Sequence, residues 1–155
     1  MKLKIQTSDE MERLGAKIAS ALQPGDLVGL VGELGAGKTT LTRGIGRALG
    51  IRGTVSSPTF VIARTHPSAR GNFIHVDAYR LSSPAELDDL DLDFAGSIVV
   101  VEWAKGMIES LADSWLEVSI ERATGHSAVG NPEEDTRFVD IIGHGPRFEN
   151  FRLEA

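Results

Sequence analysis

The chain has 155 residues, of which 41% are hydrophobic and 25% are charged, and its formal net charge is −6. A chain of this size and composition is typical of a single soluble domain that buries about two-thirds of its unfolded surface. The sequence contains no cysteine, which excludes disulfides, thiolate nucleophiles and cysteine-based zinc sites. No apolar stretch approaches the roughly 20 residues that a membrane span needs, and the first residues are too polar for a signal peptide. We therefore expect a cytoplasmic protein that does not contact a membrane.

The predicted elements begin with a short strand over residues 3–6 and a helix that runs to about Leu22. Thr7 and Glu10 match the capping-box pattern, in which two side chains satisfy free N–H groups at the start of a helix. Four apolar residues recur at helical spacing in this helix: Met11, Leu14, Ile18 and Leu22. This stripe predicts that the helix packs on a sheet rather than presenting a separate binding face.

An apolar run at residues 27–31 leads directly into the segment 32–39, which matches the pattern G-x-x-x-x-G-K-[ST]. In such a loop the glycines let backbone N–H groups close on phosphates, Lys38 reaches the terminal phosphates, and the Thr39 hydroxyl can hold Mg²⁺. We therefore predict that the chain binds a nucleoside triphosphate; an ordinary glycine-rich turn is the alternative interpretation. The loop residues predicted to bind the nucleotide are Glu33, Leu34, Gly35, Ala36, Gly37, Lys38, Thr39 and Thr40.

The helix that follows the loop is predicted to end near Gly50. Its buried side is marked by Leu41, Ile45 and Leu49. Gly44 and Gly46 lie inside it, where each glycine costs about 1 kcal/mol relative to alanine. Close packing against a neighbouring element is one explanation for this pair.

Two further strands are predicted over residues 59–64 and 73–77. The segment 66–72 between them has the composition of a surface loop, so the two strands can form a β-hairpin. The run 98–101 is apolar and mostly β-branched, which predicts a central strand buried on both faces.

Acidic residues close two of these strands, Asp77 the second and Glu102 the third. In open α/β sheets the ligand lies beyond the carboxyl ends of the strands, so both carboxylates can lie near the Mg²⁺ that Thr39 holds. We predict Thr39, Glu102 and Asp77 as metal-linked residues, and Lys38, Asp77 and Glu102 as catalytic residues. Asp77 can instead orient the attacking water, and either acid can simply end its strand.

The rest of the chain predicts a short helix after residue 103, a strand over 115–121, a polar loop over 123–135 and a strand over 137–142. Residues 1–145 then form one domain. Residues 146–155 are predicted to be a flexible C-terminal tail.

The charge is unevenly distributed along the chain. Between residues 38 and 80, seven basic residues stand against one acidic residue, a local charge of +6, so the remainder carries −12. This segment can serve ATP alone, meet RNA or an acidic partner, or consist of scattered solvated arginines. An acidic stretch follows, which either docks a basic protein surface or is a solvated helix and loop. Its members are Glu86, Asp88, Asp89, Asp91 and Asp93.

Four motifs, in chain order, are similar to the signature series of the bacterial TsaE (YjeE-like) ATPases. They are Gly32-x-Leu34-Gly35-Ala36-Gly37-Lys38-Thr39-Thr40, Ser57-Pro58-Thr59-Phe60, His75-x-Asp77-x-Tyr79-Arg80 and Val101-Glu102-Trp103. The similarity covers nearly the whole chain. It implies an α/β fold of the P-loop NTPase type, a three-layer sandwich with a mostly parallel central sheet and antiparallel additions.

This resemblance implies an ATPase required for threonylcarbamoyladenosine (t6A) formation next to the anticodon of tRNA. In such systems a TsaC-type enzyme makes threonylcarbamoyl-adenylate, and TsaD transfers the threonylcarbamoyl group to tRNA with TsaB as its partner. TsaE hydrolyses ATP to permit repeated cycles. The implied partners are therefore TsaD and TsaB, the implied cofactor is Mg²⁺, and ATP is the substrate; whether the chain touches tRNA directly is left open.

The resemblance also implies roles for individual residues. Thr39 and Glu102 manage Mg²⁺, Asp77 lies by the γ-phosphate, and the catalytic residue Thr59 sits on a switch-like segment that senses the nucleotide. Trp103 is expected to take part in nucleotide binding; covering the end of a strand is its alternative role.

Hydrolysis at such a site is an in-line attack of water on the γ-phosphorus, with the charge countered by Mg²⁺, Lys38 and loop N–H groups. No residue is clearly an arginine finger within the chain: Arg80 and Arg64 are candidates, and a partner protein is the other source. An arginine finger is worth roughly 10³ to 10⁵ in rate, so a finger from a partner predicts weak activity of the chain alone.

Three other functions share the phosphate loop. A small-molecule kinase needs an acceptor pocket and usually a basic lid late in the chain, whereas residues 123–135 are acidic and glycine-rich. A GTP switch needs an Asn-Lys-x-Asp segment for guanine, which this sequence lacks. A nucleotide-binding module without significant turnover uses the same residues as the ATPase.

Overall fold

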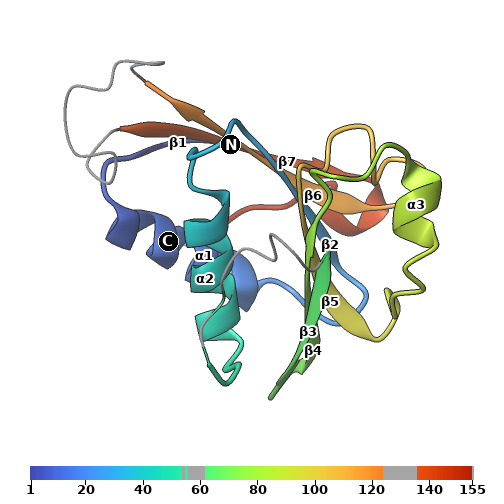
Figure 1. Cartoon of the computed structure of the whole chain (residues 1–155). Coiled ribbons are helices and arrows are strands. Elements are labelled where there is room, and N and C mark those ends of the chain that lie inside the picture. Colours follow the sequence, from blue (N-terminus) through green and yellow to red (C-terminus); the bar gives the residue numbers. More distant parts are fainter. Residues whose placement is uncertain (54, 56–61, 124–135, 155) are drawn as a thin grey trace.

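The computed structural model describes residues 1–53, 55, 62–123 and 136–154, and Figure 1 shows one central sheet with helices on both of its faces. The predicted site residue Thr59 and the loop at 124–135 lie outside the described residues. In chain order the elements are β1 (Lys2–Ile5), α1 (Ser8–Ser20), β2 (Leu27–Val31), α2 (Lys38–Ala48), β3 (Ala63–Ser68), β4 (Gly71–Asp77), α3 (Pro84–Asp88), β5 (Ser97–Glu102), β6 (Trp115–Arg122), β7 (Arg137–His144) and the 3₁₀ helix η1 (Pro146–Phe148).

The described residues form a seven-stranded sheet in the order β1-β7-β6-β2-β5-β4-β3. Its middle is parallel, because β2 pairs in parallel with both β5 and β6, and β4 pairs in parallel with β5. The outer pairs β1–β7, β6–β7 and β3–β4 are antiparallel. This arrangement confirms the predicted mixed α/β class with antiparallel additions, but only the middle of the sheet is parallel, because three of the six strand pairings are antiparallel.

Two apolar layers hold the helices to the sheet. α1 and α2 lie on one face (Figure 1), where the predicted stripe of α1 packs with Phe73, Val28 and Val100 of the sheet. On the opposite face, α3 and the adjoining chain cover strands β2, β5 and β4, where they pack on sheet residues such as Ile74 and Val99. β5 is buried along its full length, as predicted. None of the helices in the described residues is long and apolar enough to cross a membrane.

The crossing of α1 and α2 depends on glycine. A methyl group added at Gly44 would collide with the backbone oxygen of Glu12, and one added at Gly15 would collide with the backbone oxygen of Leu41. A methyl group at Gly46 would press against two apolar side chains. Close packing is therefore confirmed as the reason for Gly44 and Gly46 inside α2, despite the helix propensity that they lose.

The N-terminus of α1 has the predicted cap. The Thr7 hydroxyl accepts a hydrogen bond from the backbone N–H of Glu10 at 3.1 Å. The Glu10 carboxylate in turn accepts from the backbone N–H of Gln6 at 2.6 Å. These two bonds satisfy donors that have no partner within the helix, so this end of α1 is fixed by local sequence.

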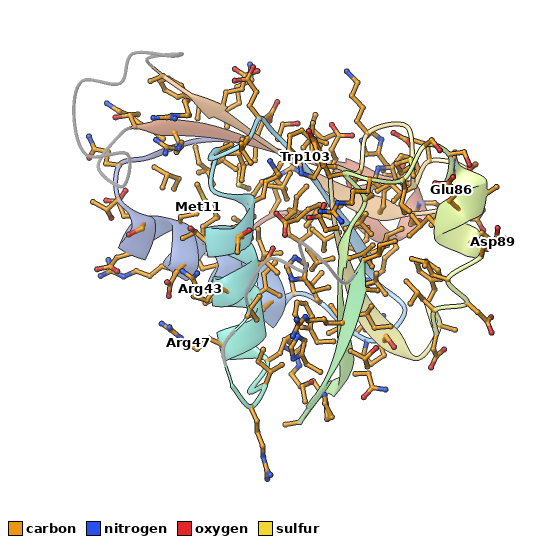
Figure 2. All side chains as sticks on the ribbon, in the orientation of Figure 1. Met11, Arg43, Arg47, Glu86, Asp89 and Trp103 are labelled. Carbon is orange, nitrogen blue, oxygen red and sulfur yellow. The ribbon has the colours of Figure 1, made fainter. Side chains whose placement is uncertain are left out.

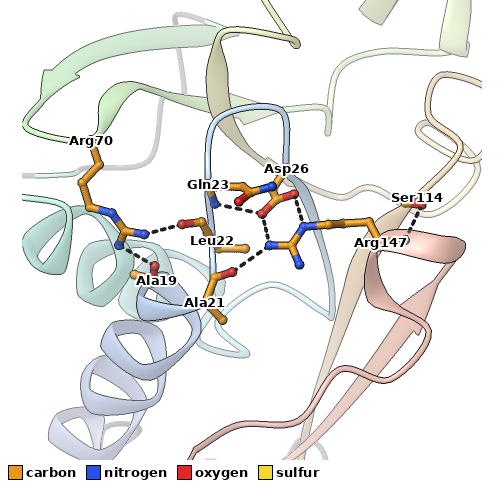
Figure 3. Close-up of polar contacts among 8 residues, drawn as sticks. All are labelled: Ala19, Ala21, Leu22, Gln23, Asp26, Arg70, Ser114 and Arg147. Atoms are coloured by element: carbon orange, nitrogen blue, oxygen red, sulfur yellow. Dashed lines mark hydrogen bonds and ion pairs between the residues drawn. The ribbon is translucent and has the colours of Figure 1, made fainter.

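The C-terminus of α1 is instead held by two arginines from distant parts of the chain (Figure 3). Arg70, at the tip of the β3–β4 hairpin, donates to the carbonyl of Ala19 at 2.8 Å and to a second carbonyl just beyond the helix. Arg147, in η1, donates to the carbonyl of Ala21 at 2.9 Å and pairs with the buried carboxylate of Asp26. Both cations donate to carbonyls at or just beyond the end of the helix and oppose the negative end of the helix dipole.

The β3–β4 hairpin extends nearer to its turn than predicted, whereas β3 begins only at Ala63; residue 62 is not strand, and residues 59–61 of the predicted strand lie outside the described residues. β3 extends to Ser68 and β4 begins at Gly71, so most of the expected surface loop 66–72 is strand, with Pro67 opposite Asn72. Proline is tolerated here because β3 is an edge strand, where half of the N–H groups have no neighbouring strand to bind. The predicted loop is wrong, whereas the predicted hairpin is confirmed.

The short helix predicted after residue 103 is not formed, and residues 104–112 form turns and bends in the described structure. Gly106 has a φ of 79°, in the left-handed region. The Glu109 carboxylate accepts from the backbone N–H of Gly106 at 3.0 Å and from that of Ile108 at 3.1 Å. These side-chain hydrogen bonds hold the backbone in turns in place of a helix, so the prediction is wrong.

The segment that follows β7 packs on the fold. The sequence predicts a flexible tail from residue 146, but in the structure residues 146–148 form η1 and Phe148 is buried in the layer that holds α1. Phe151 and Leu153 pack against the same layer. The structure therefore differs from the expected tail, because three apolar side chains and the Arg147–Asp26 pair attach this segment to the sheet and α1.

Candidate functional site

The loop between β2 and α2 faces a cavity of about 550 Å³. Gly35 and Gly37 have φ values of 77° and 117°, which L side chains rarely adopt, so the loop needs glycine at these positions. The predicted residues from Leu34 to Thr40 line the cavity, whereas Glu33 lines an adjoining one. The other wall residues are Ile62, Asp77, Tyr79, Arg80, Glu102 and Trp103.

Lys38 begins α2 and projects into this site. Its ammonium donates to the carbonyl of Gly32 at 2.6 Å and to the carbonyl of Glu33 at 2.8 Å. Burial lowers the pKa of Lys38 below its usual value, while the nearby carboxylates of Glu102 and Asp77 act in the opposite direction. Burial thus destabilises the charged form of Lys38, whereas the two carboxylates stabilise it.

Glu102 is the centre of a buried hydrogen-bond chain. One carboxylate oxygen, Oε1, accepts from the Thr39 hydroxyl at 3.2 Å. The other oxygen, Oε2, lies 2.5 Å from Nε2 of His75. Glu102 is only 3% exposed and His75 is fully buried. The structure therefore brings Thr39 and Glu102 together as predicted and adds a histidine that the sequence analysis quoted only as part of a motif.

Asp77 ends β4 beside Glu102, because the two residues are partners in the parallel pairing of β4 and β5. Its Oδ1 accepts from the backbone N–H of Tyr79 at 3.0 Å, which fixes the turn that follows the strand. Both acids therefore emerge at the carboxyl ends of neighbouring strands, next to the phosphate loop, where the sequence analysis places them.

The oxygen donors at this end of the sheet fit Mg²⁺. No group of three or more His, Asp or Glu side chains in the described residues could hold a metal ion by itself. Mg²⁺ sites commonly use one or two carboxylates together with substrate phosphates and water, rather than a cage made entirely of protein. The Thr39 hydroxyl, Glu102 and Asp77 supply a donor set of that kind.

Trp103 lies at the loop end of β5 (Figure 2), directly after Glu102. Its ring centroid is 4.0 Å from the Lys38 ammonium and 4.9 Å from the ring centroid of Tyr79. Its backbone has a φ of 59°, a conformation that costs energy for a large side chain and is often found at functional sites. Two other side chains at the cavity are strongly exposed, Tyr79 at 67% and Leu34 at 87%. The cavity mouth is thus bordered by aromatic and apolar surface.

Part of the basic stretch makes contacts within the fold, whereas the acidic stretch is exposed. Arg43 and Arg47 of α2 both lie against Glu12 of α1, at 3.7 Å and 2.7 Å, and Arg70 binds carbonyls of α1. Three of the basic residues between 38 and 80 are therefore structural. In the acidic stretch, Figure 2 shows Glu86 on α3 and Asp89 directly after it, on the face opposite α1 and α2. The described acids of this stretch are exposed, as a solvated helix and loop would be.

A family model for TsaE, described as a threonylcarbamoyl adenosine biosynthesis protein, matches residues 5–129. The chain belongs to the TsaE family. A TsaE of Streptomyces coelicolor is 51% identical over 143 residues, covering 89% of this chain and 93% of that protein. A TsaE of Bacillus subtilis is 34% identical over 150 residues, covering 96% and 89%. Both relatives are named tRNA threonylcarbamoyladenosine biosynthesis proteins.

A solved structure has a similar fold. The crystal structure of Bacillus subtilis YdiB superposes with a TM-score of 0.72 at 28% identity. The alignment covers 94% of this chain and 86% of that one, so the likeness extends over the whole described fold rather than the phosphate loop alone.

One residue beyond the span of the TsaE model was missed by the sequence analysis. Arg137, the first residue of β7, is nearly buried and donates from Nε to the carbonyl of Ala36 at 2.9 Å. Its Nη2 donates to the carbonyl of Gly35 at 3.3 Å. Arg137 thus holds the outer carbonyls of the phosphate loop, and no local pattern predicts a contact between residues 101 positions apart.

Proposed function

We propose that this chain is a Mg²⁺-dependent ATPase of the P-loop NTPase type that acts in tRNA threonylcarbamoyladenosine formation. The observation that carries this proposal is the meeting of Lys38, Thr39, Asp77 and Glu102 around one cavity at the phosphate loop. The names of its relatives support the pathway. The chemistry of the site supports ATP hydrolysis.

The site binds ATP mainly through its phosphates. The N–H groups of the loop and the N-terminus of α2 present positive partial charge to an anion. The Lys38 ammonium adds a full positive charge at the cavity wall, and its bonds to two loop carbonyls are exchanged for bonds to the terminal phosphates.

When bound, Mg²⁺ would supply positive charge that neutralises the phosphates. Thr39 and Glu102 are the residues that would hold it, with Asp77 beside them as a further oxygen donor.

Hydrolysis is the attack of water on the γ-phosphorus, which breaks the bond to the bridging oxygen and yields ADP and inorganic phosphate. Asp77 is the carboxylate proposed to orient this water, since it ends β4 at the cavity wall. Lys38 and the loop N–H groups counter the charge on the phosphoryl oxygens. Thr59, outside the described residues, keeps its proposed role in sensing the nucleotide on the resemblance alone.

TsaD and TsaB are the proposed partners. Arg80 lines the cavity and Arg64 does not, so Arg80 is the better candidate for an arginine finger within the chain. A partner that supplies the finger is the alternative source, and the exposed Leu34 and Tyr79 at the cavity mouth offer it a contact surface. Weak activity of the chain alone follows if the finger belongs to the partner.

The test is Mg²⁺-dependent phosphate release from ATP, measured with and without a TsaB–TsaD complex. Lys38→Ala serves as the control for contaminating ATPase. We expect slow release by the chain alone and strong stimulation by the complex, both lost in Lys38→Ala. Transfer of phosphate to a small acceptor would favour a kinase, and binding without turnover in any mixture would favour a nucleotide-binding module.

A further inference from the structure

The geometry points to His75 as a positioning residue that orients the Glu102 carboxylate for Mg²⁺. This inference rests on the proposed function and extends it to a residue that makes no contact with the cavity. His75 is fully buried in β4 and is absent from the cavity wall, so its effect on the ligand must pass through Glu102.

The first step is the state of the imidazole. Nδ1 of His75 is buried and has no hydrogen-bond partner in the described residues, whereas Nε2 lies 2.5 Å from Oε2 of Glu102. A proton on Nδ1 of a neutral ring would be an unsatisfied buried donor, and Nε2 would then face a carboxylate as a second acceptor. The tautomer that satisfies the pair has the proton on Nε2, which donates to Glu102.

The second step is the orientation of the carboxylate. Oε2 lies against His75 and Oε1 accepts from the Thr39 hydroxyl, so both oxygens of the Glu102 carboxylate are fixed. The free lone pairs of Oε1 therefore stay at the Thr39 side, where the proposed metal is held. A side chain that is 3% exposed gains few hydrogen bonds from water, so no solvent can replace the histidine in this role.

The third step is the expected size of the effect. Groups that orient a metal ligand typically change metal affinity by about 10–100-fold when they are removed. Loss of His75 should therefore weaken the Mg²⁺-dependent part of nucleotide binding by at least about tenfold. Binding without Mg²⁺ depends on the loop and Lys38, which His75 does not touch, and should be unchanged.

The experiment measures the dissociation constant of a non-hydrolysable ATP analogue, with Mg²⁺ and with a chelator. The central pair is His75→Gln, whose amide N–H can reach Oε2, and His75→Asn, whose shorter side chain cannot. His75→Leu removes the donor while keeping an apolar filler. His66→Leu is the matched control, since His66 stacks on Phe73 at 6.0 Å in the same hairpin and is not bonded to Glu102.

We expect the gain in affinity from Mg²⁺ to fall in His75→Asn and His75→Leu and to be restored in His75→Gln, with His66→Leu like the wild type. In a Glu102→Ala background, replacing His75 should not reduce the gain in affinity from Mg²⁺ any further. An unchanged Mg²⁺ gain in folded His75→Asn, or an equal loss with and without Mg²⁺, would overturn the inference. No Mg²⁺ gain in the wild type would instead overturn the proposed function, and the inference with it.

Discussion

Replacing Arg137 by methionine should weaken nucleotide binding, although this residue approaches the phosphate loop from behind. In a phosphate loop N–H groups turn toward the ligand, and in this loop the carbonyls of Gly35 and Ala36 turn toward Arg137. Arg137 binds two of those carbonyls, Ala36 at 2.9 Å and Gly35 at 3.3 Å. It therefore favours the loop conformation that presents the N–H groups to the phosphates. Methionine keeps much of the apolar stem and removes the guanidinium.

The magnitude follows from these two bonds. A hydrogen bond that involves a charged group contributes about 1.5–3 kcal/mol, and the longer bond to Gly35 adds little. Arg137 is nearly buried, so water does not compensate for its loss. Affinity falls only by the part of this energy that holds the free loop in its binding conformation, and because about 1.4 kcal/mol corresponds to a tenfold change, we expect ADP to bind up to about tenfold more weakly. The melting temperature should fall by about 3–12 °C for a domain of this size.

The assay is ADP titration by calorimetry, with thermal unfolding followed by circular dichroism. Arg147→Met is the matched control, because Arg147 also donates to a backbone carbonyl, that of Ala21, and pairs with the buried Asp26, but at the far end of α1. It should lose stability and keep its affinity for ADP. Arg137→Lys should be intermediate, since lysine cannot reproduce the forked geometry. A folded Arg137→Met protein with wild-type affinity for ADP would refute the reasoning.

Three further predictions concern the lysine, the tryptophan and the helix crossing. Because burial lowers the pKa of Lys38, affinity for ADP should fall as pH rises through this lowered pKa, which is earlier than for an exposed lysine. Calorimetric titrations from neutral to alkaline pH should show this loss of affinity at a still lower pH in Glu102→Gln, because that variant lacks a carboxylate that raises the Lys38 pKa. The same pH dependence in the variant and the wild type would contradict this prediction. The Trp103 ring lies 4.0 Å from the Lys38 ammonium at the site, whereas Trp115 stacks on His144 at 4.5 Å. ADP should therefore change the fluorescence of the Trp115→Phe variant, which keeps Trp103. A fluorescence change in Trp103→Phe and none in Trp115→Phe would show that Trp103 is not the residue that responds to the nucleotide. Gly44→Ala should destabilise the fold by about 1–3 kcal/mol, because its methyl group meets the backbone of α1, and a melting temperature equal to that of the wild type would show that the helices can separate freely.

Features that depend on neighbouring residues could be predicted from the sequence. The capping box at Thr7 and Glu10, the phosphate loop and the buried strand β5 are each contained in a short stretch, and the structure has them where expected. The meeting of Thr39 with Glu102 was also predictable, because parallel strands end at the same edge of a sheet.

Features that depend on distant residues could not be predicted in this way. Pro67 reads as a loop residue until β3 is known to be an edge strand. Arg137 and Arg147 read as surface arginines until β7 and η1 are placed beside the phosphate loop and α1. His75 carries a local signal, a polar residue inside an apolar strand, but its partner lies 27 residues further on in the chain. A polar residue in a buried strand predicts that a hydrogen-bond partner exists, but the sequence does not identify that partner.

The position of β1 bears on how this protein is made. In the described sheet β1 pairs with β7, so a strand that is synthesised before the other strands of this sheet has its partner among residues 137–144. The apolar face of α1 and the phosphate loop also receive contacts from this late part of the chain, through Phe148 and Arg137. Pairing across such a separation has a high entropic cost and is slow to form. A nascent chain stalled before β7 would therefore expose the surface that chaperones and proteases recognise, and competence to bind nucleotide would arise only after β7 has been synthesised.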